Sequence, residues 1–177
     1  MTDKERLCSR IMVIDTSTDD EAKCIAEIDG VVMKLKYRDN GELLAVCDNG
    51  VYNFRKNGKT DFEIDFGGRT LIECNVDNAR NMVFAFDSGL NNTVVESYSS
   101  SGKLRGNYET NGEMLAFDVN GEYILTACLD GITRISPSGK VKGKMDINRD
   151  IKAIKMFSGR NEVLLLGSGN ADIIKVR

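Results

Sequence analysis

Short, nearly unbroken hydrophobic runs, each closed by a turn that contains glycine, recur four times along the chain. The runs occupy residues 43–47, 82–86, 123–128 and 163–166. Because apolar residues do not alternate with polar ones, each run predicts a strand that is buried on both faces. The closing glycines, at positions 50, 89, 131 and 169, are spaced by 39, 42 and 38 residues. A repeat of about 40 residues built from short strands is typical of β-propeller blades.

Strands of mixed polarity flank each hydrophobic run and complete a four-stranded unit. A first strand precedes the run at 31–37, 71–76, 114–117 and 151–157. A half-polar third strand follows at 51–54, 93–98 and 132–135. The segment Phe62–Phe66 alternates between apolar and acidic residues, which is the pattern of an outer edge strand. Asn-Gly pairs between first and second strands predict tight hairpin turns.

The two ends of the chain predict incomplete units. Residues 10–14 and 24–28 supply only a third and a fourth strand, and the last repeat stops after its third strand, at 173–176. The pattern therefore predicts an all-β protein of seventeen strands. We expect a β-propeller of about four four-stranded blades, closed by strands from both termini. Closure within one chain and closure across a homodimer fit the pattern equally well.

The expected domain organisation is a short N-terminal arm at 1–9 and a single propeller domain at 10–177. The blade repeats fall near 31–67, 70–109, 113–147 and 151–177, the last completed by 10–28.

Two turn motifs carry a family resemblance. The apolar runs end in Asp-Asn-Gly at 48–50 and Asp-Ser-Gly at 87–89, and the third strands are followed by Asn-Gly-Lys at 57–59 and Ser-Gly-Lys at 101–103 and 138–140. This sequence of elements resembles bacterial β-propeller repeat proteins of the quinoprotein-like and YVTN-like kind. The resemblance covers residues 10–177 and implies binding through loops. No cofactor is expected, because the chain has no tryptophan for a quinoprotein docking motif.

The amino-acid composition limits the catalytic and metal-binding chemistry that the chain can perform. The chain has 177 residues, a net charge of −3 and no histidine, so it lacks the usual general base and the commonest transition-metal ligand. We therefore expect a protein that is not an enzyme and holds no metal. The five cysteines include no close pair, which argues against zinc and favours reduced thiols in a cytoplasmic protein. No apolar run approaches the 18 residues or more of a membrane span.

Two sets of turn residues are candidate binding surfaces. Turns after second strands and nearby loops form an acidic loop face for a protein partner, made of Asp48, Asn49, Asp87, Asn91, Asn92, Asp130, Arg69 and Arg149. Turns on the opposite side form an alternative anion-binding face, made of Arg38, Lys56, Lys59, Arg80, Lys103, Lys140 and Arg160.

The favoured hypothesis is a non-catalytic module that binds a protein, as an inhibitor, immunity-type or scaffold protein. One alternative is binding of nucleic acid or another polyanion through the basic turns. The other is a small carbohydrate-active enzyme that uses the loop aspartates as acid and base.

Overall fold

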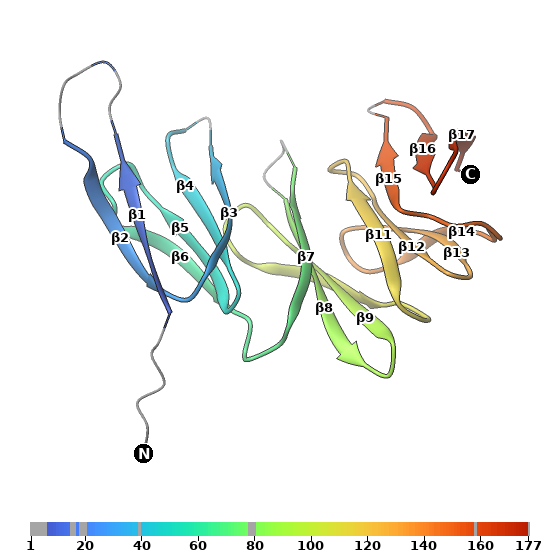
Figure 1. Cartoon of the computed structure of the whole chain (residues 1–177), viewed down its shortest axis with the longest axis horizontal. Coiled ribbons are helices and arrows are strands. Elements are labelled where there is room, and N and C mark those ends of the chain that lie inside the picture. The colour runs from blue at the N-terminus through green and yellow to red at the C-terminus, as the bar shows by residue number, and fades with distance from the viewer. Residues whose placement is uncertain are drawn as a thin grey trace. The chain divides into compact units, whose positions relative to one another are not determined.

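The computed structural model describes residues 7–14, 17, 21–38, 40–77, 81–157 and 159–176. Within these residues the chain forms seventeen strands and no helix (Figure 1). The strands make five antiparallel sheets of two, four, four, four and three strands, in chain order. This grouping confirms the strand count predicted from the hydrophobic pattern, and it fits about four blades. The chain divides into two compact units, Met1–Thr70 and Leu71–Arg177.

The first unit holds a two-stranded and a four-stranded sheet. Its strands are β1 (Cys8–Val13), β2 (Lys23–Asp29), β3 (Val32–Tyr37), β4 (Leu43–Cys47), β5 (Gly50–Phe54) and β6 (Thr60–Asp65). Ile11 and Ile28 pack with Leu43, Ala45 and Phe54 in one hydrophobic core, which joins the two sheets. β1 begins at Cys8, inside the segment expected to be an arm, and residues 1–6 of that arm lie outside the described residues.

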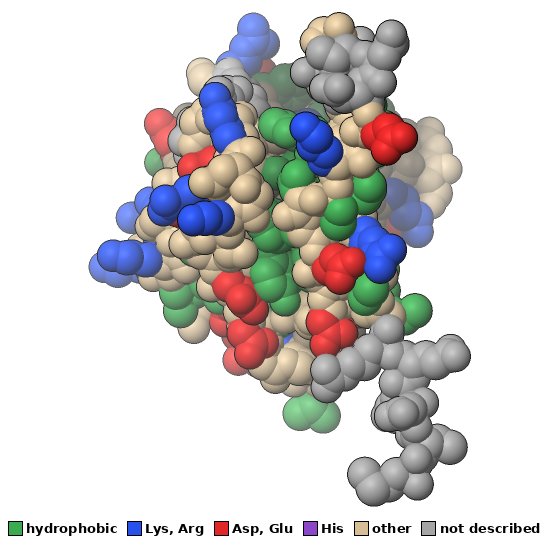
Figure 2. All heavy atoms as spheres, turned by 90° about the vertical axis from the view of Figure 1, so that its left-hand side faces the viewer, with side chains coloured by type: hydrophobic (Ala, Val, Ile, Leu, Met, Phe, Trp, Pro, Cys, Tyr) green, Lys and Arg blue, Asp and Glu red, His purple; other side chains and the backbone are tan. Residues whose placement is uncertain are grey.

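Several large hydrophobic side chains of the first unit remain exposed. Met33, Leu35 and Tyr37 of β3 are exposed, as is Met12 of β1. Figure 2, which views the left-hand side of Figure 1, shows hydrophobic side chains on the surface there between acidic and basic ones. The two-stranded sheet lacks the further strands that a full blade would provide.

The second unit contains two four-stranded sheets and a three-stranded sheet. The first comprises β7 (Leu71–Val76), β8 (Met82–Gly89), β9 (Asn92–Tyr98) and β10 (Leu104–Glu109). The second comprises β11 (Met114–Val119), β12 (Ile124–Cys128), β13 (Gly131–Ile135) and β14 (Val141–Met145). The third comprises β15 (Ala153–Met156), β16 (Glu162–Leu166) and β17 (Ala171–Lys175). Each strand pairs with its neighbour in the chain, so every sheet is a simple meander.

The middle sheet of the second unit is buried on both faces. Val83 and Phe117 belong to a core shared with the preceding sheet, and Leu125 and Leu165 belong to a core shared with the following one. The first strand of the middle sheet, β11, also lies next to β7 and β15, the first strands of its two neighbours. Neighbouring first strands and face-to-face sheets are the arrangement of blades in a propeller.

A repeated turn explains the Gly-Lys motif. In each copy the glycine N–H donates to the carbonyl three residues before it, and the residue that supplies this carbonyl donates its own N–H to the lysine carbonyl. Gly58, Gly102 and Gly139 adopt φ of 78°, 78° and 81°, a conformation that side chains with a Cβ rarely take. The motif is therefore required by the backbone of the turn, and the lysine side chains are left exposed.

Candidate functional site

In the first unit, the residues predicted for the acidic loop face also hold their loops in place. The Val31 N–H donates a hydrogen bond of 2.9 Å to Asp48 Oδ1. Asn49 Nδ2 donates to the carbonyl of Asp29, and Arg69 Nε donates to the carbonyl of Phe66 at 2.9 Å. Asp48 and Asn49 are exposed, while Arg69 is half-buried.

The second unit holds the larger part of this predicted surface. The Gly89 N–H donates to Asp87 Oδ1 at 2.8 Å, so the aspartate stabilises its own turn. Asn92 bridges two segments, because its Nδ2 donates to Glu109 and its Oδ1 accepts from the Gly112 N–H. These contacts fix the turns and leave the Asp87 side chain exposed.

Two ion pairs cross the loops of the second unit. Lys144 Nζ lies 3.2 Å from Asp130 Oδ2, and this hydrogen bond raises the pKa of Lys144. Arg149 pairs with Asp172. A hydrogen bond from Ser168 lowers the pKa of the neighbouring Asp150. The surface therefore carries charges of both signs, held in local pairs.

Two exposed leucines in the turns after β8 and β12 were not predicted from the sequence as site residues. Leu90 is 97% exposed between β8 and β9, and Leu129 is 76% exposed at the equivalent turn between β12 and β13. Leu90 and Asn91 adopt φ of 53° and 64°, the two consecutive left-handed residues of a type I′ hairpin turn. An aliphatic residue is rare in this conformation, and strained residues of this kind cluster at functional sites. The signal that could have found Leu90 was an aliphatic residue where a two-residue hairpin normally has Asn or Gly.

The residues of the alternative anion-binding face differ in accessibility. The lysines are all exposed: Lys56, Lys59, Lys103 and Lys140. Arg38 is buried, with its guanidinium 5.8 Å from the centre of the Phe62 ring and 3.5 Å from Glu42, so it offers little surface to a polyanion. Arg80 lies outside the described residues.

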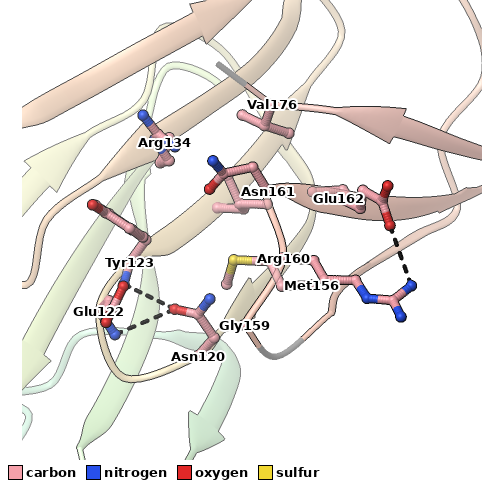
Figure 3. Close-up of a pocket in the computed structure, with 12 residues that line it drawn as sticks. Asn120, Glu122, Tyr123, Arg134, Met156, Gly159, Arg160, Asn161, Glu162 and Val176 are labelled. Atoms are coloured by element: carbon pink, nitrogen blue, oxygen red, sulfur yellow. Dashed lines mark hydrogen bonds and ion pairs between the residues drawn. The ribbon is translucent and has the colours of Figure 1, made fainter.

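Arg160 lies at the edge of a pocket of about 320 Å³ in the second unit (Figure 3). The pocket lies between the sheet β11–β14 and the sheet β15–β17. Asn120 and Tyr123 come from the turn between β11 and β12, Arg134 comes from β13, and Asn161 comes from the turn before β16. Apolar side chains form the rest of the wall: Leu125, Met156, Val163 and Val176.

Neither surface gathers the ligands of a metal ion. Among the described residues, no group of three or more Cys, Asp or Glu side chains could hold a metal. The five cysteines are free thiols, of which Cys47 and Cys128 are buried. In the part of the chain that the structure describes, no helix is long and apolar enough to cross a membrane.

Solved structures with a similar fold include natural and designed propellers. The C-terminal WD40 domain of Sif2 has a TM-score of 0.68 at 14% identity, over 95% of this chain and 52% of that one. The computationally designed proteins Ika4 and Ika8 have TM-scores of 0.61 and 0.66, at 12% and 11% identity. The aligned regions are 85% of this chain with 94% of Ika4, and 83% of this chain with 46% of Ika8. The chain thus spans about half the length of Ika8 and of the Sif2 domain.

These similarities establish a propeller-like fold, as the sequence repeats predicted. No curated protein matches the sequence. One family profile matches almost all of it, residues 1–176. The chain therefore belongs to the family described as "Family of unknown function (DUF5711)".

Proposed function

We propose that the chain is a non-catalytic binding module that contacts a protein partner through the turns of its second unit. The observation that carries the proposal is Leu90, which is 97% exposed in a left-handed conformation. Exposing a leucine gains nothing for the isolated fold, and holding it in this conformation costs stability. Burial of the leucine side chain in an apolar pocket of a partner would offset this loss of stability.

Leu129 and the neighbouring charges extend this surface. Leu129 occupies the equivalent turn of the next sheet, so two leucines project from successive hairpins. Asp87 and Asp130 lie beside them and are exposed. We therefore expect a partner surface with apolar pockets and a basic rim, on which the module acts by steric occlusion with electrostatic matching.

Co-elution on size-exclusion chromatography with a protein from a lysate of the source cells would identify the partner. Purified complexes would then be compared for the wild type, Leu90→Asn, Leu129→Asn and the double variant Asp87→Ala/Asp130→Ala. Leu104→Asn is the matched control, because Leu104 is exposed on β10 away from these turns. The leucine variants should weaken the complex by roughly tenfold or more, as expected for interface anchors. Equal affinity for all variants would rule out this surface.

Polyanion binding is a second candidate. The supporting observation is that exposed lysines recur in the turns after the third strands, at Lys59, Lys103 and Lys140. Binding of duplex DNA or RNA through them should weaken steeply as the salt concentration rises. Absent or salt-independent binding would remove this candidate.

We also propose that strands from the two ends of the chain complete one blade, within one chain or across a dimer. The two-stranded sheet β1–β2 and the three-stranded sheet β15–β17 support this, because each falls short of four strands. The exposed side chains of Leu35 and Tyr37 need further strands to cover them. Light scattering distinguishes the two routes: the mass of one chain is 19.6 kDa, and a shared ring doubles it.

Five free cysteines support a reducing compartment, and we propose a cytoplasmic location on this basis.

A further inference from the structure

Arg134 lacks the partners that a half-buried guanidinium normally has. Its Nε is buried without a hydrogen-bond partner. Its guanidinium carbon lies 4.8 Å from the centre of the Tyr123 ring, and no acidic side chain of the described residues forms an ion pair with it. Cation–π contact stabilises the charge but leaves the N–H groups without acceptors. Buried donors are nearly always paired, so an unpaired one in the wall of a pocket calls for an explanation.

The equivalent position in the first unit has a carboxylate acceptor, which Arg134 lacks. Arg134 is paired with Leu125 across β12 and β13, and Asn53 is paired with Leu44 in the same register of β4 and β5. Asn53 donates to the carboxylate of Glu42 at 3.2 Å. The residue that corresponds to Glu42 in the second unit is Tyr123, which has no carboxylate. The second unit therefore has a cation at this position and no carboxylate at the position that corresponds to Glu42.

We propose that the pocket beside Arg134 binds a small molecule that carries one carboxylate on an apolar body. The two terminal N–H groups of a guanidinium form a planar fork that matches the two oxygens of a carboxylate. Met156 and Val176 supply an apolar wall beside it (Figure 3). A volume of about 320 Å³ lies at the lower end of the range for small-molecule sites.

The remaining polar groups favour one negative charge over two. Asn120 Oδ1 already accepts from the N–H groups of Glu122 and Tyr123, so its amide nitrogen is left as a donor for the ligand. Glu122 and Glu162 also line the pocket, and Glu162 lies 3.6 Å from Arg160. These two carboxylates repel a dianion such as phosphate more strongly than a monocarboxylate.

Phenylacetate tests the proposal, with phenylacetamide and inorganic phosphate as the comparison probes. In the wild-type protein, the Nε–H NMR resonance of Arg134 should shift on titration with phenylacetate and stay in place with the neutral amide. Arg134→Met should weaken phenylacetate binding by roughly tenfold or more, since it removes a charge-assisted contact. Arg149→Met is the matched control, because Arg149 lies outside the pocket and should leave binding unchanged.

An unchanged Arg134 resonance, or equal affinity of Arg134→Met and the wild type, would overturn the proposal. Equal or tighter binding of phosphate would overturn the assignment to a monocarboxylate. The resonance is read in the wild type, so the test does not depend on how well the variant folds. Leu90→Asn should retain phenylacetate binding, which separates the outcome from that of the proposed protein interface.

Discussion

The carboxylate of Asp118 accepts a hydrogen bond of 2.8 Å from the backbone N–H of Met156, which ties β11 to β15 in the next sheet. Its other oxygen accepts from Lys155 at 2.7 Å and from Asn75, on β7 of the preceding sheet, at 3.3 Å. One buried side chain thus holds three successive sheets of the second unit together. The Asp118 side chain is only 4% exposed.

Replacing Asp118 should therefore be among the most destabilising single changes in the second unit. Asp118→Ala leaves the buried Met156 N–H without an acceptor, which we expect to lower the free energy of unfolding by about 2–4 kcal/mol. Lys155 is largely exposed, so its ion pair with Asp118 contributes the smaller part of this free energy. Urea denaturation measures the change. Asp130→Ala is the control, because its ion pair with Lys144 is exposed and its loss should shift the midpoint little.

Leu90→Asn should stabilise the protein. Asparagine tolerates the left-handed conformation that Leu90 adopts at φ 53°, and the leucine side chain loses no packing because it is 97% exposed. We expect a gain of about 0.5–1 kcal/mol in the free energy of unfolding. Leu129→Asn is the matched control, since Leu129 is exposed at the equivalent turn without a positive φ. A gain of the same size in both variants would mean that the backbone of Leu90 is not strained.

The features that could be predicted from the sequence are those that each repeat encodes locally. Buried runs such as Leu43–Cys47 and turns such as Ser101-Gly102-Lys103 depend only on neighbouring residues, so hydrophobic pattern and glycine position suffice to find them. The strand count follows from the same local signals. Strand ends were predicted less accurately: β15 covers Ala153–Met156, where the pattern predicted 151–157.

The candidate sites were harder to predict because they depend on register and on contacts between sheets. Arg134 meets Tyr123 because the pairing of β12 with β13 brings the two side chains to one face. Asp118 is buried because β15 supplies donors from a position far along the chain. Neither relationship leaves a trace in composition or spacing. Leu90 was overlooked because an isolated leucine between two strands has the same polarity pattern as a continuation of one of them.

Thiol labelling should separate the cysteines by burial. Cys8 and Cys24 are exposed, whereas Cys47 and Cys128 are buried. At pH 8 we expect Ellman's reagent to modify Cys8 and Cys24 rapidly in the native protein. Cys47 and Cys128 should react only as the protein unfolds, because burial raises the pKa of both thiols and blocks access. The variant Cys8→Ser/Cys24→Ser should lose the rapid phase, and its persistence would contradict the assignment.

Alkaline pH should destabilise the fold through the same buried thiols. Burial raises the pKa of Cys47 from its ordinary value of 9.0 to about 11, and it also raises the pKa of Cys128 and of Tyr52. An acid whose pKa is higher in the folded state stays protonated there while the unfolded chain loses its proton, so the unfolded state gains stability as pH rises. The free energy of unfolding should therefore fall as the pH rises from about 9 to about 11. Urea denaturation across this range measures the slope.

The variant Cys47→Ala is the control. It should start from a lower stability at neutral pH and show a shallower decline. An unchanged slope would mean that Cys47 ionises as readily in the folded chain as in the unfolded one.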